Sequence, residues 1–267
     1  MTAPSYDLAG KTAFMSGATS GINLRIAERF AQAGARVFVV SRSVEKVEAT
    51  VEGLRALGAE AEGRSVDARS YPDVEAAVQA CSQAFGKIDV CLAGQAGNFP
   101  AGAAQMSANA FKSVVDIDLL GTFNVFRAAV HEANRGGEGE AGASFIAITA
   151  PQATRPMMFQ SHVCAAKAGV NMLVKCMAME WGLSGVRVNA ISPGPIDETE
   201  GMDRLAPTEE SREQYRQALA LKRFGSKDDI AGAALWLCSE HAAYVTGTIL
   251  EVEGGTTLGD ASTAMKI

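Results

Sequence analysis

Short apolar runs alternate along the chain with stretches in which apolar residues recur with a helical period. The run at 35–40 is apolar on both faces of an extended chain, as in a parallel strand that helices cover on each side. Segments that predict strands lie at 12–16, 35–40, 60–66, 88–93, 144–149, 186–191 and 248–252. Segments with helical periodicity lie between them at 24–33, 43–57, 73–85, 107–130, 157–181 and 227–239.

This alternation predicts an α/β fold, a Rossmann-type, doubly wound parallel sheet of seven strands with helices on both faces. The chain has 267 residues, 48% of them hydrophobic, which is enough for one domain with a large core or for two small ones. We expect a single domain over 1–267. The charged segment 197–223 leaves the carboxyl edge of the sheet and is predicted to be a substrate lid.

The segment 16–23 joins the first strand to the first helix through a glycine turn. Gly17 can adopt a positive φ without strain, and Gly21 has no side chain to keep a phosphate from the backbone. The N-terminus of the helix adds unpaired N–H groups, and the hydroxyls of Ser16, Thr19 and Ser20 add further donors. The pattern predicts a pyrophosphate cradle, although an ordinary strand-to-helix turn has the same glycines.

The ends of the second and third strands indicate which nucleotide is bound. The second strand ends in Ser41 and Arg42, and no acid appears before Glu45. A guanidinium suits a phosphate, so the 2′-phosphate of NADP is favoured over the bare hydroxyl of NAD, unless Arg42 is only a solvated loop residue. Asp67, which is followed by Ala68, is placed either to accept a hydrogen bond from adenine or to cap the next turn.

Net charge and cysteine content narrow the partners. A net charge of −6 without a long basic run argues against nucleic acid and against a polybasic membrane patch. The five cysteines form no C-x-x-C pair, so we expect reduced, mostly buried thiols, and no metal site is predicted. Because residues 1–11 lack an export signal and 265–267 are only loosely similar to a peroxisomal address, we expect the protein in the cytoplasm.

Two charged residues lie in apolar surroundings. Asp118 belongs to the predicted helix 107–130, where its neighbours have the pattern of buried residues, and an unpaired carboxylate there would be costly. Lys167 lies among apolar residues of the predicted helix 157–181, where a lysine could also extend its amine to the solvent. Both are candidates for chemistry.

Several motifs together identify a family. They are the glycine turn 17–23, the pair Asp67-Ala68, the turn 93–97, Lys167 with its helix, the pair Pro193-Gly194, and 252–255. Over essentially its whole length the chain resembles the short-chain dehydrogenase/reductase superfamily. Within that superfamily, 96–99, 116–124 and 193–196 are similar to the 2,4-dienoyl-CoA reductases, above all those of the peroxisomal type.

The resemblance implies an NADPH-dependent reductase that converts 2,4-dienoyl-CoA to 3-enoyl-CoA. It also implies a homotetramer built from the helices after the fourth and fifth strands, and an acyl-CoA as the small-molecule substrate. The residues expected to bind the cofactor are Ser16, Gly17, Thr19, Ser20, Gly21, Ile22, Ser41, Arg42, Asp67, Ala68, Ala93, Gly94, Lys167, Pro193, Gly194 and Ile196.

Three positions depart from the superfamily pattern. The third glycine of the turn is Asn23, a residue that tolerates a left-handed backbone. Val163 stands four residues before Lys167, where a tyrosine is usual, and Ala150 replaces the usual serine. The four tyrosines lie elsewhere in the sequence, at Tyr6, Tyr71, Tyr215 and Tyr244.

These departures disfavour carbonyl chemistry. A carbonyl reductase needs a general acid for the nascent alkoxide, and losing one typically costs about 10² to 10⁴ in rate. Reduction of a conjugated C=C instead spreads charge onto a thioester oxygen, and a proton reaches carbon afterwards. We therefore expect Lys167 to hold the nicotinamide ribose and, with Asp118, to orient a water that delivers the proton, as the resemblance also suggests. An ion pair that only joins two helices is the alternative.

Two other functions remain open. One is a carbonyl reductase or 3-hydroxyacyl dehydrogenase with an atypical acid such as His162, which lies about 140° around the helix from Lys167. The other is a catalytically silent NADP-binding protein. For a CoA substrate, basic residues of the lid could bind the phosphates, namely Arg204, Arg212, Arg216, Lys222 and Arg223.

Overall fold

A seven-stranded, wholly parallel sheet forms the centre of the molecule, in the order β3-β2-β1-β4-β5-β6-β7. The computed structural model describes residues 6–133 and 142–263. The strands are β1 Thr12–Ser16, β2 Arg36–Ser41, β3 Ala61–Ser65, β4 Val90–Ala93, β5 Ser144–Ile148, β6 Arg187–Pro193 and β7 Ile249–Val252. The predicted fold class is confirmed.

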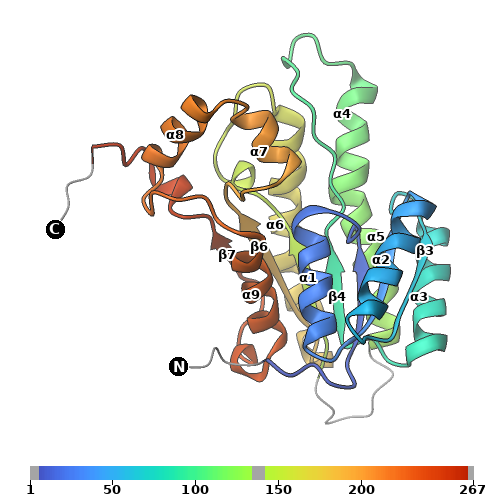
Figure 1. Ribbon diagram of the computed structural model, residues 1–267. Helices are drawn as coiled ribbons and strands as arrows, with labels where there is room; N and C mark the ends of the chain where they lie inside the picture. Colours follow the sequence, from blue (N-terminus) through green and yellow to red (C-terminus); the bar gives the residue numbers. More distant parts are fainter. Residues whose placement is uncertain (1–5, 134–141, 264–267) are drawn as a thin grey trace, which may run out of the picture.

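Helices cover both faces of this sheet (Figure 1). One face carries α1 Gly21–Gln32, α2 Val44–Ala56 and α9 Lys227–Cys238. The other carries α3 Tyr71–Phe85, α5 Gly121–Ala133 and α6 Ser161–Trp181. Above the carboxyl ends of the strands lie α4 Ala108–Val115 on one side and α7 Glu200–Leu205 with α8 Glu209–Ala218 on the other (Figure 1). Short 3₁₀ turns lie at Pro151–Ala153, Gly182–Ser184, Glu240–Ala242 and Thr256–Leu258.

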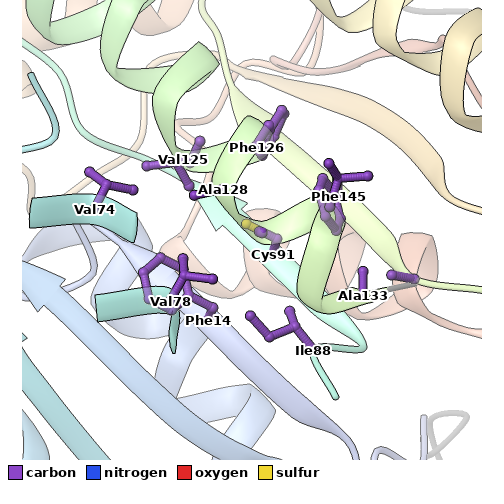
Figure 2. Close-up of a cluster of buried hydrophobic side chains, with 14 of the residues drawn as sticks. Phe14, Val74, Val78, Ile88, Cys91, Val125, Phe126, Ala128, Ala133 and Phe145 are labelled. Atoms are coloured by element: carbon purple, nitrogen blue, oxygen red, sulfur yellow. The ribbon is translucent and has the colours of Figure 1, made fainter. Parts of the chain in front are cut away.

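Two apolar cores lie on either side of the sheet, because its five central strands, β2, β1, β4, β5 and β6, are buried on both faces, whereas the edge strands β3 and β7 are partly exposed. Figure 2 shows the core between the sheet and α3, α5 and α6, where Phe14, Cys91 and Phe145 of the strands meet Val78 and Phe126 of the helices. Helix caps fix where the helices begin. The Ser43 hydroxyl accepts from the Lys46 N–H at 3.2 Å at the start of α2.

The predicted helix 107–130 is wrong in one respect. It is divided into α4, a π-helical segment at Asp116–Leu120, and α5, which ends at Ala133. Such π segments are rare and often lie at functional sites. This π-helical segment contains Asp118, which is buried.

Other predicted boundaries also shift. The first helix begins at Gly21 rather than at residue 24, and α6 begins at Ser161 rather than at 157. The segment before α6 has a left-handed residue, Phe159 with φ 63°, which a regular helix cannot contain. The predicted loop at 134–142 falls almost wholly outside the described residues, as do residues 264–267 of the predicted tail 259–267. None of the described helices is long and apolar enough to span a membrane.

Candidate active site

The glycine turn lies at the point where the strand order reverses, since β1 pairs with β2 on one side and with β4 on the other. Gly17 has φ 71°, and a Cβ there would lie 2.6 Å from the Gln95 nitrogen. Gly21, the first residue of α1, has φ 57°. No side chain fits at Gly17, so the two turns after β1 and β4 can pack closely and leave the N-terminus of α1 open to an anion.

Asn23 binds these two turns together. Its Nδ2 donates to the Gly94 carbonyl at 2.7 Å and approaches the Gly17 carbonyl at 3.3 Å. A Cβ on Gly94 would lie only 2.4 Å from that nitrogen, so Gly94 makes room for the amide. Asn23 lies inside α1 with a helical backbone, and the left-handed conformation considered for it does not occur.

A groove of about 600 Å³ runs from the glycine turn across the ends of β2 and β3. The predicted residues that line it are Ser16, Gly17, Thr19, Ser20, Ser41, Arg42, Asp67, Ala68 and Gly94. Other residues, not predicted from the sequence, also line it, among them Asn23, Lys46, Arg69 and Gln95. Lys46 follows Arg42 by four residues, so the clustering of basic residues after β2 is the signal that could have found it.

The far end of this groove is positively charged. Arg42 and Lys46 both line it, and neither is in an ion pair with a described carboxylate. Asp67 accepts from the Arg69 N–H at 3.0 Å and from its Nε at 2.9 Å, so it caps its own turn, the second of the two roles considered for it. The hydrogen bond from Arg69 holds the pKa of Asp67 below its usual value. A glycine cradle with free cations beside it fits a phosphorylated dinucleotide.

The remaining predicted residues lie outside this groove. Gly21 lines a neighbouring hollow, Ile22 is in the first turn of α1, and Ala93 is the buried last residue of β4. Pro193 ends β6. Gly194 follows, where a Cβ would meet the Glu253 Cα at 2.5 Å, and Ile196 is 3% exposed. Gly194 is therefore required by the close approach of the chain after β7.

A buried ion pair joins the π-helical segment to α6. The Lys167 Nζ lies 3.1 Å from Asp118 Oδ2 and donates to the Ile148 carbonyl at 2.9 Å. Asp118 is 1% exposed, Lys167 is 5% exposed, and the Gly97 N–H donates to Asp118 Oδ1 at 2.7 Å. The carboxylate, the ammonium and the turn after β4 thus meet at the carboxyl ends of β4 and β5, as the sequence predicts for two catalytic groups.

The side-chain hydrogen bonds of this pair, in the part of the chain that the structure describes, go to backbone groups. No hydrogen bond joins a tyrosine to Lys167 or Asp118 in 6–133 or 142–263, and Val163 is buried in a small apolar cluster. His162 is 0% exposed, and its ring lies 4.5 Å from that of Phe99, centroid to centroid. Neither imidazole nitrogen has a hydrogen-bond partner among the described residues. The role of His162 as an acid stays a hypothesis.

A second cavity of about 410 Å³ lies between the segment after β5, α8 and the segment after β7. Its lining is mostly apolar and includes Pro151, Met157, Met158, Tyr215 and Leu219. Because it is bordered by the predicted lid 197–223, it has the place and character of a site for an apolar substrate chain.

Most of the lid cations have partners of their own. Arg212 pairs with Asp197, Arg216 with Glu209 and Glu213, and Arg223 with Asp229. The Lys222 Nζ donates to the carbonyls of Gln217 and Ala261. These four cations are engaged within the protein, and the side chain of the fifth proposed cation, Arg204, lies outside the described residues.

A glycine cradle at the switch point of a parallel sheet and a buried lysine beside it define a dinucleotide-binding oxidoreductase. A family model described as Enoyl-(Acyl carrier protein) reductase matches residues 17–257. The chain belongs to the short-chain dehydrogenase/reductase family.

Three relatives illustrate the similarity. The chain is 42% identical to the peroxisomal 2,4-dienoyl-CoA reductase [(3E)-enoyl-CoA-producing] of Rattus norvegicus, across 93% of this chain and 84% of that protein. It is 39% identical to the enzyme of the same name from Arabidopsis thaliana, across 92% and 84%. A solved 7α-hydroxysteroid dehydrogenase, complexed with NADH and 7-oxo glycochenodeoxycholic acid, is 30% identical with a TM-score of 0.87, across 94% of this chain and 96% of that one.

Proposed function

We propose that this protein reduces a conjugated enoyl thioester with NADPH, converting 2,4-dienoyl-CoA to 3-enoyl-CoA. The observation that carries the proposal is the buried Asp118–Lys167 pair, which has no tyrosine hydrogen-bonded to it among the described residues. The names of the relatives from Rattus norvegicus and Arabidopsis thaliana support the same substrate class.

The groove supports NADPH as the reductant. When bound, NADPH supplies the hydride. The glycine turn and the N-terminus of α1 would hold the pyrophosphate, and Arg42 and Lys46 would hold the 2′-phosphate. Lys167 would donate to the nicotinamide ribose, because its ammonium has three donors, and the Ile148 carbonyl is its one hydrogen-bond acceptor among the described residues.

The Asp118–Lys167 pair would assist protonation of the substrate after hydride transfer. Hydride addition at C5 of the dienoyl group moves charge through the conjugated system onto the thioester oxygen, and the product forms when C2 gains a proton. Asp118 can accept a hydrogen bond from a water and Lys167 can donate one to it, so together they orient the water that supplies this proton. No alkoxide forms, and no phenol is needed to protonate one.

One assay separates the proposal from its two rivals. NADPH oxidation is followed with a 2,4-dienoyl-CoA, then with acetoacetyl-CoA, and then without substrate. We expect turnover of the dienoyl-CoA only. Reduction of acetoacetyl-CoA would favour a carbonyl reductase with an atypical acid, and nucleotide binding without any turnover would favour a silent NADP-binding protein.

We also propose a cytoplasmic homotetramer. Large apolar side chains are exposed on the π-helical segment, α5 and α6 and just beyond α6, which supports an interface there; they are Leu120, Phe123, Met172, Met179 and Leu183. Sedimentation equilibrium should give four times the monomer mass of 27.8 kDa. A monomer at micromolar concentration would contradict this assembly.

A further inference from the structure

Gln160, the N-cap residue of α6, is a polar side chain on the catalytic face of that helix that the proposed mechanism has not used. We propose that the Gln160 side-chain amide donates the hydrogen bond to the thioester oxygen of the substrate, and that Gln152 holds it in place. This inference rests on the proposed reduction of a dienoyl-CoA. It assigns the group that stabilises the charge which hydride addition creates.

The first observation is the position of Gln160 along α6. Residues 160, 163 and 167 are spaced by three and four positions, so they lie on one face of the helix. Lys167 is the ion-paired lysine on that face, and Val163 stands between it and Gln160. Gln160 is 8% exposed, so most of its surface is held out of bulk water.

The second observation is the direction of the Gln160 amide. The Gln152 Nε2 donates to Gln160 Oε1 at 3.0 Å and lies 3.8 Å from the Met157 sulfur, which can only accept. Because its oxygen is occupied, Gln160 turns its Nε2 donors the other way. Among the described residues, no group accepts a hydrogen bond from that nitrogen. Met157 lines the second cavity, so the amide pair borders the predicted acyl site.

The third observation is the strained backbone just before Gln160. Phe159 has φ 63°, a conformation that aromatic residues rarely adopt, and its carbonyl accepts from the Ala101 N–H at 2.9 Å. Backbone strain of this kind is found at functional sites, where the surrounding structure holds it in place. The Cys164 N–H in turn donates to the Gln160 carbonyl at 2.9 Å, which fixes Gln160 at the start of the helix.

The proposed reaction requires a hydrogen-bond donor some distance from the carbon that gains the hydride. In a ketone, the carbon that gains hydride is bonded to the oxygen that gains charge. In a dienoyl thioester, hydride adds at C5, a new C3=C4 bond forms, and the carbonyl π pair moves to an oxygen five bonds away, about 5 Å or more along an extended chain. Protonation at C2 then restores the carbonyl. Gln160 lies three residues before Val163, about 4.5 Å further along the helix axis, which matches this displacement.

A spectroscopic experiment tests the donor directly. A 2,4-dienoyl-CoA is bound to the enzyme in the presence of NADP⁺, which cannot reduce it, and the absorption of the dienoyl thioester is recorded. Polarisation of the carbonyl shifts this absorption to the red, and we expect the shift in the natural enzyme. Gln160→Glu keeps an acceptor for Gln152 but removes the donor, so the shift should disappear. The single-turnover rate with NADPH should fall by about 10²-fold or more.

The controls separate this inference from the proposed function. Gln160→Leu should behave like Gln160→Glu, and Gln152→Leu should weaken the shift. Gln32→Leu, at an exposed glutamine at the end of α1, should leave both the shift and the rate unchanged. A full red shift in either Gln160 variant would overturn the inference, as would a natural enzyme that reduces dienoyl-CoA but shows no shift. Failure of the natural enzyme to reduce dienoyl-CoA would remove the proposed function and this inference with it.

Discussion

The Asp118 carboxylate is buried and has partners on two segments: Lys167 on α6 and the Gly97 N–H after β4. A buried pair of this kind is weak evidence for stability, since taking both charges out of water costs about as much as their attraction returns. Its position at the carboxyl ends of β4 and β5 favours a role in chemistry.

Replacing Asp118 separates these two roles. Asp118→Asn keeps an acceptor for the Gly97 N–H but removes the charge that orients water with Lys167. We expect the turnover of dienoyl-CoA per folded enzyme to fall by about 10² or more, with NADPH affinity unchanged. Asp116→Asn is the matched control, because Asp116 lies in the same π-helical segment and pairs with Lys112 at the surface. Equal turnover of dienoyl-CoA in the two variants would show that the Asp118–Lys167 pair has only a structural role.

Arg42 is the residue that should select NADPH over NADH. A charge-assisted hydrogen bond to the 2′-phosphate is typically worth about 1.5 to 3 kcal/mol, although solvent reduces it at this groove. Arg42→Ala should therefore lower the ratio of NADPH to NADH affinity by about tenfold or more, measured by fluorescence titration. Arg29→Ala, on the exposed last turn of α1, should leave the ratio unchanged. An unchanged ratio in Arg42→Ala would return Arg42 to the role of a solvated loop residue.

At the scale of elements, helix α1 contacts the turn after β4 through the Asn23 side chain. This contact requires a glycine at position 94, because a side chain there would occupy the same space. Gly94→Ala would place a Cβ 2.4 Å from the Asn23 amide, and we expect a loss of about 1 to 3 kcal/mol in the free energy of unfolding. Asn23→Gly should cost less, because it removes a hydrogen bond without a clash. In the double variant, the cost of Gly94→Ala should largely disappear, as measured by urea unfolding. Additive costs would show that the two residues do not share this space.

Asp229, in the first turn of α9, makes a contribution to the free energy of unfolding that depends on pH. Hydrogen bonding from Arg223 lowers the pKa of Asp229 to about 2, and Asp229 also accepts from the Ser226 N–H at 2.7 Å. Because the pKa in the folded state lies below the usual 3.8, this contribution is present above about pH 4 and is lost as pH falls toward 2.

Asp229→Ala should thus reduce the free energy of unfolding by about 1 kcal/mol at pH 7, and by clearly less at pH 3. Asp228→Ala, which removes a half-exposed surface pair, should change it by a few tenths at most. Urea denaturation at the two pH values measures both variants. A deficit in Asp229→Ala that is the same at pH 7 and pH 3 would contradict the assignment.

The elements themselves could be predicted well because burial on both faces of the strands leaves a clear pattern in the sequence. The division of 107–130 could not, since a π-helical turn keeps almost the same apolar spacing as a continuous helix. The late start of α6 was also missed, because nothing in the sequence marks Phe159 as left-handed.

At the scale of the whole molecule, the sheet topology brings together residues that are far apart in the chain. Parallel strands end at one edge, so the sequence could place the glycine turn, Arg42, Asp118 and Lys167 in one region. It also indicated that Asp118 and Lys167 could pair, but it could not give most of the other partners across space. The bond from Asn23 to Gly94, the pairing of the lid cations and the amide pair of Gln152 and Gln160 are set by packing between segments.

The central claim is that Asp118 and Lys167 serve reduction of a conjugated thioester, with the proton coming from water. The most direct test is to reduce a 2,4-dienoyl-CoA with NADPH in D₂O and to locate the deuterium by NMR. The account predicts a 3-enoyl-CoA with one solvent deuterium at C2 and none at C5. A 2-enoyl product, with deuterium at C4, or an enzyme that reduces only acetoacetyl-CoA, would contradict it.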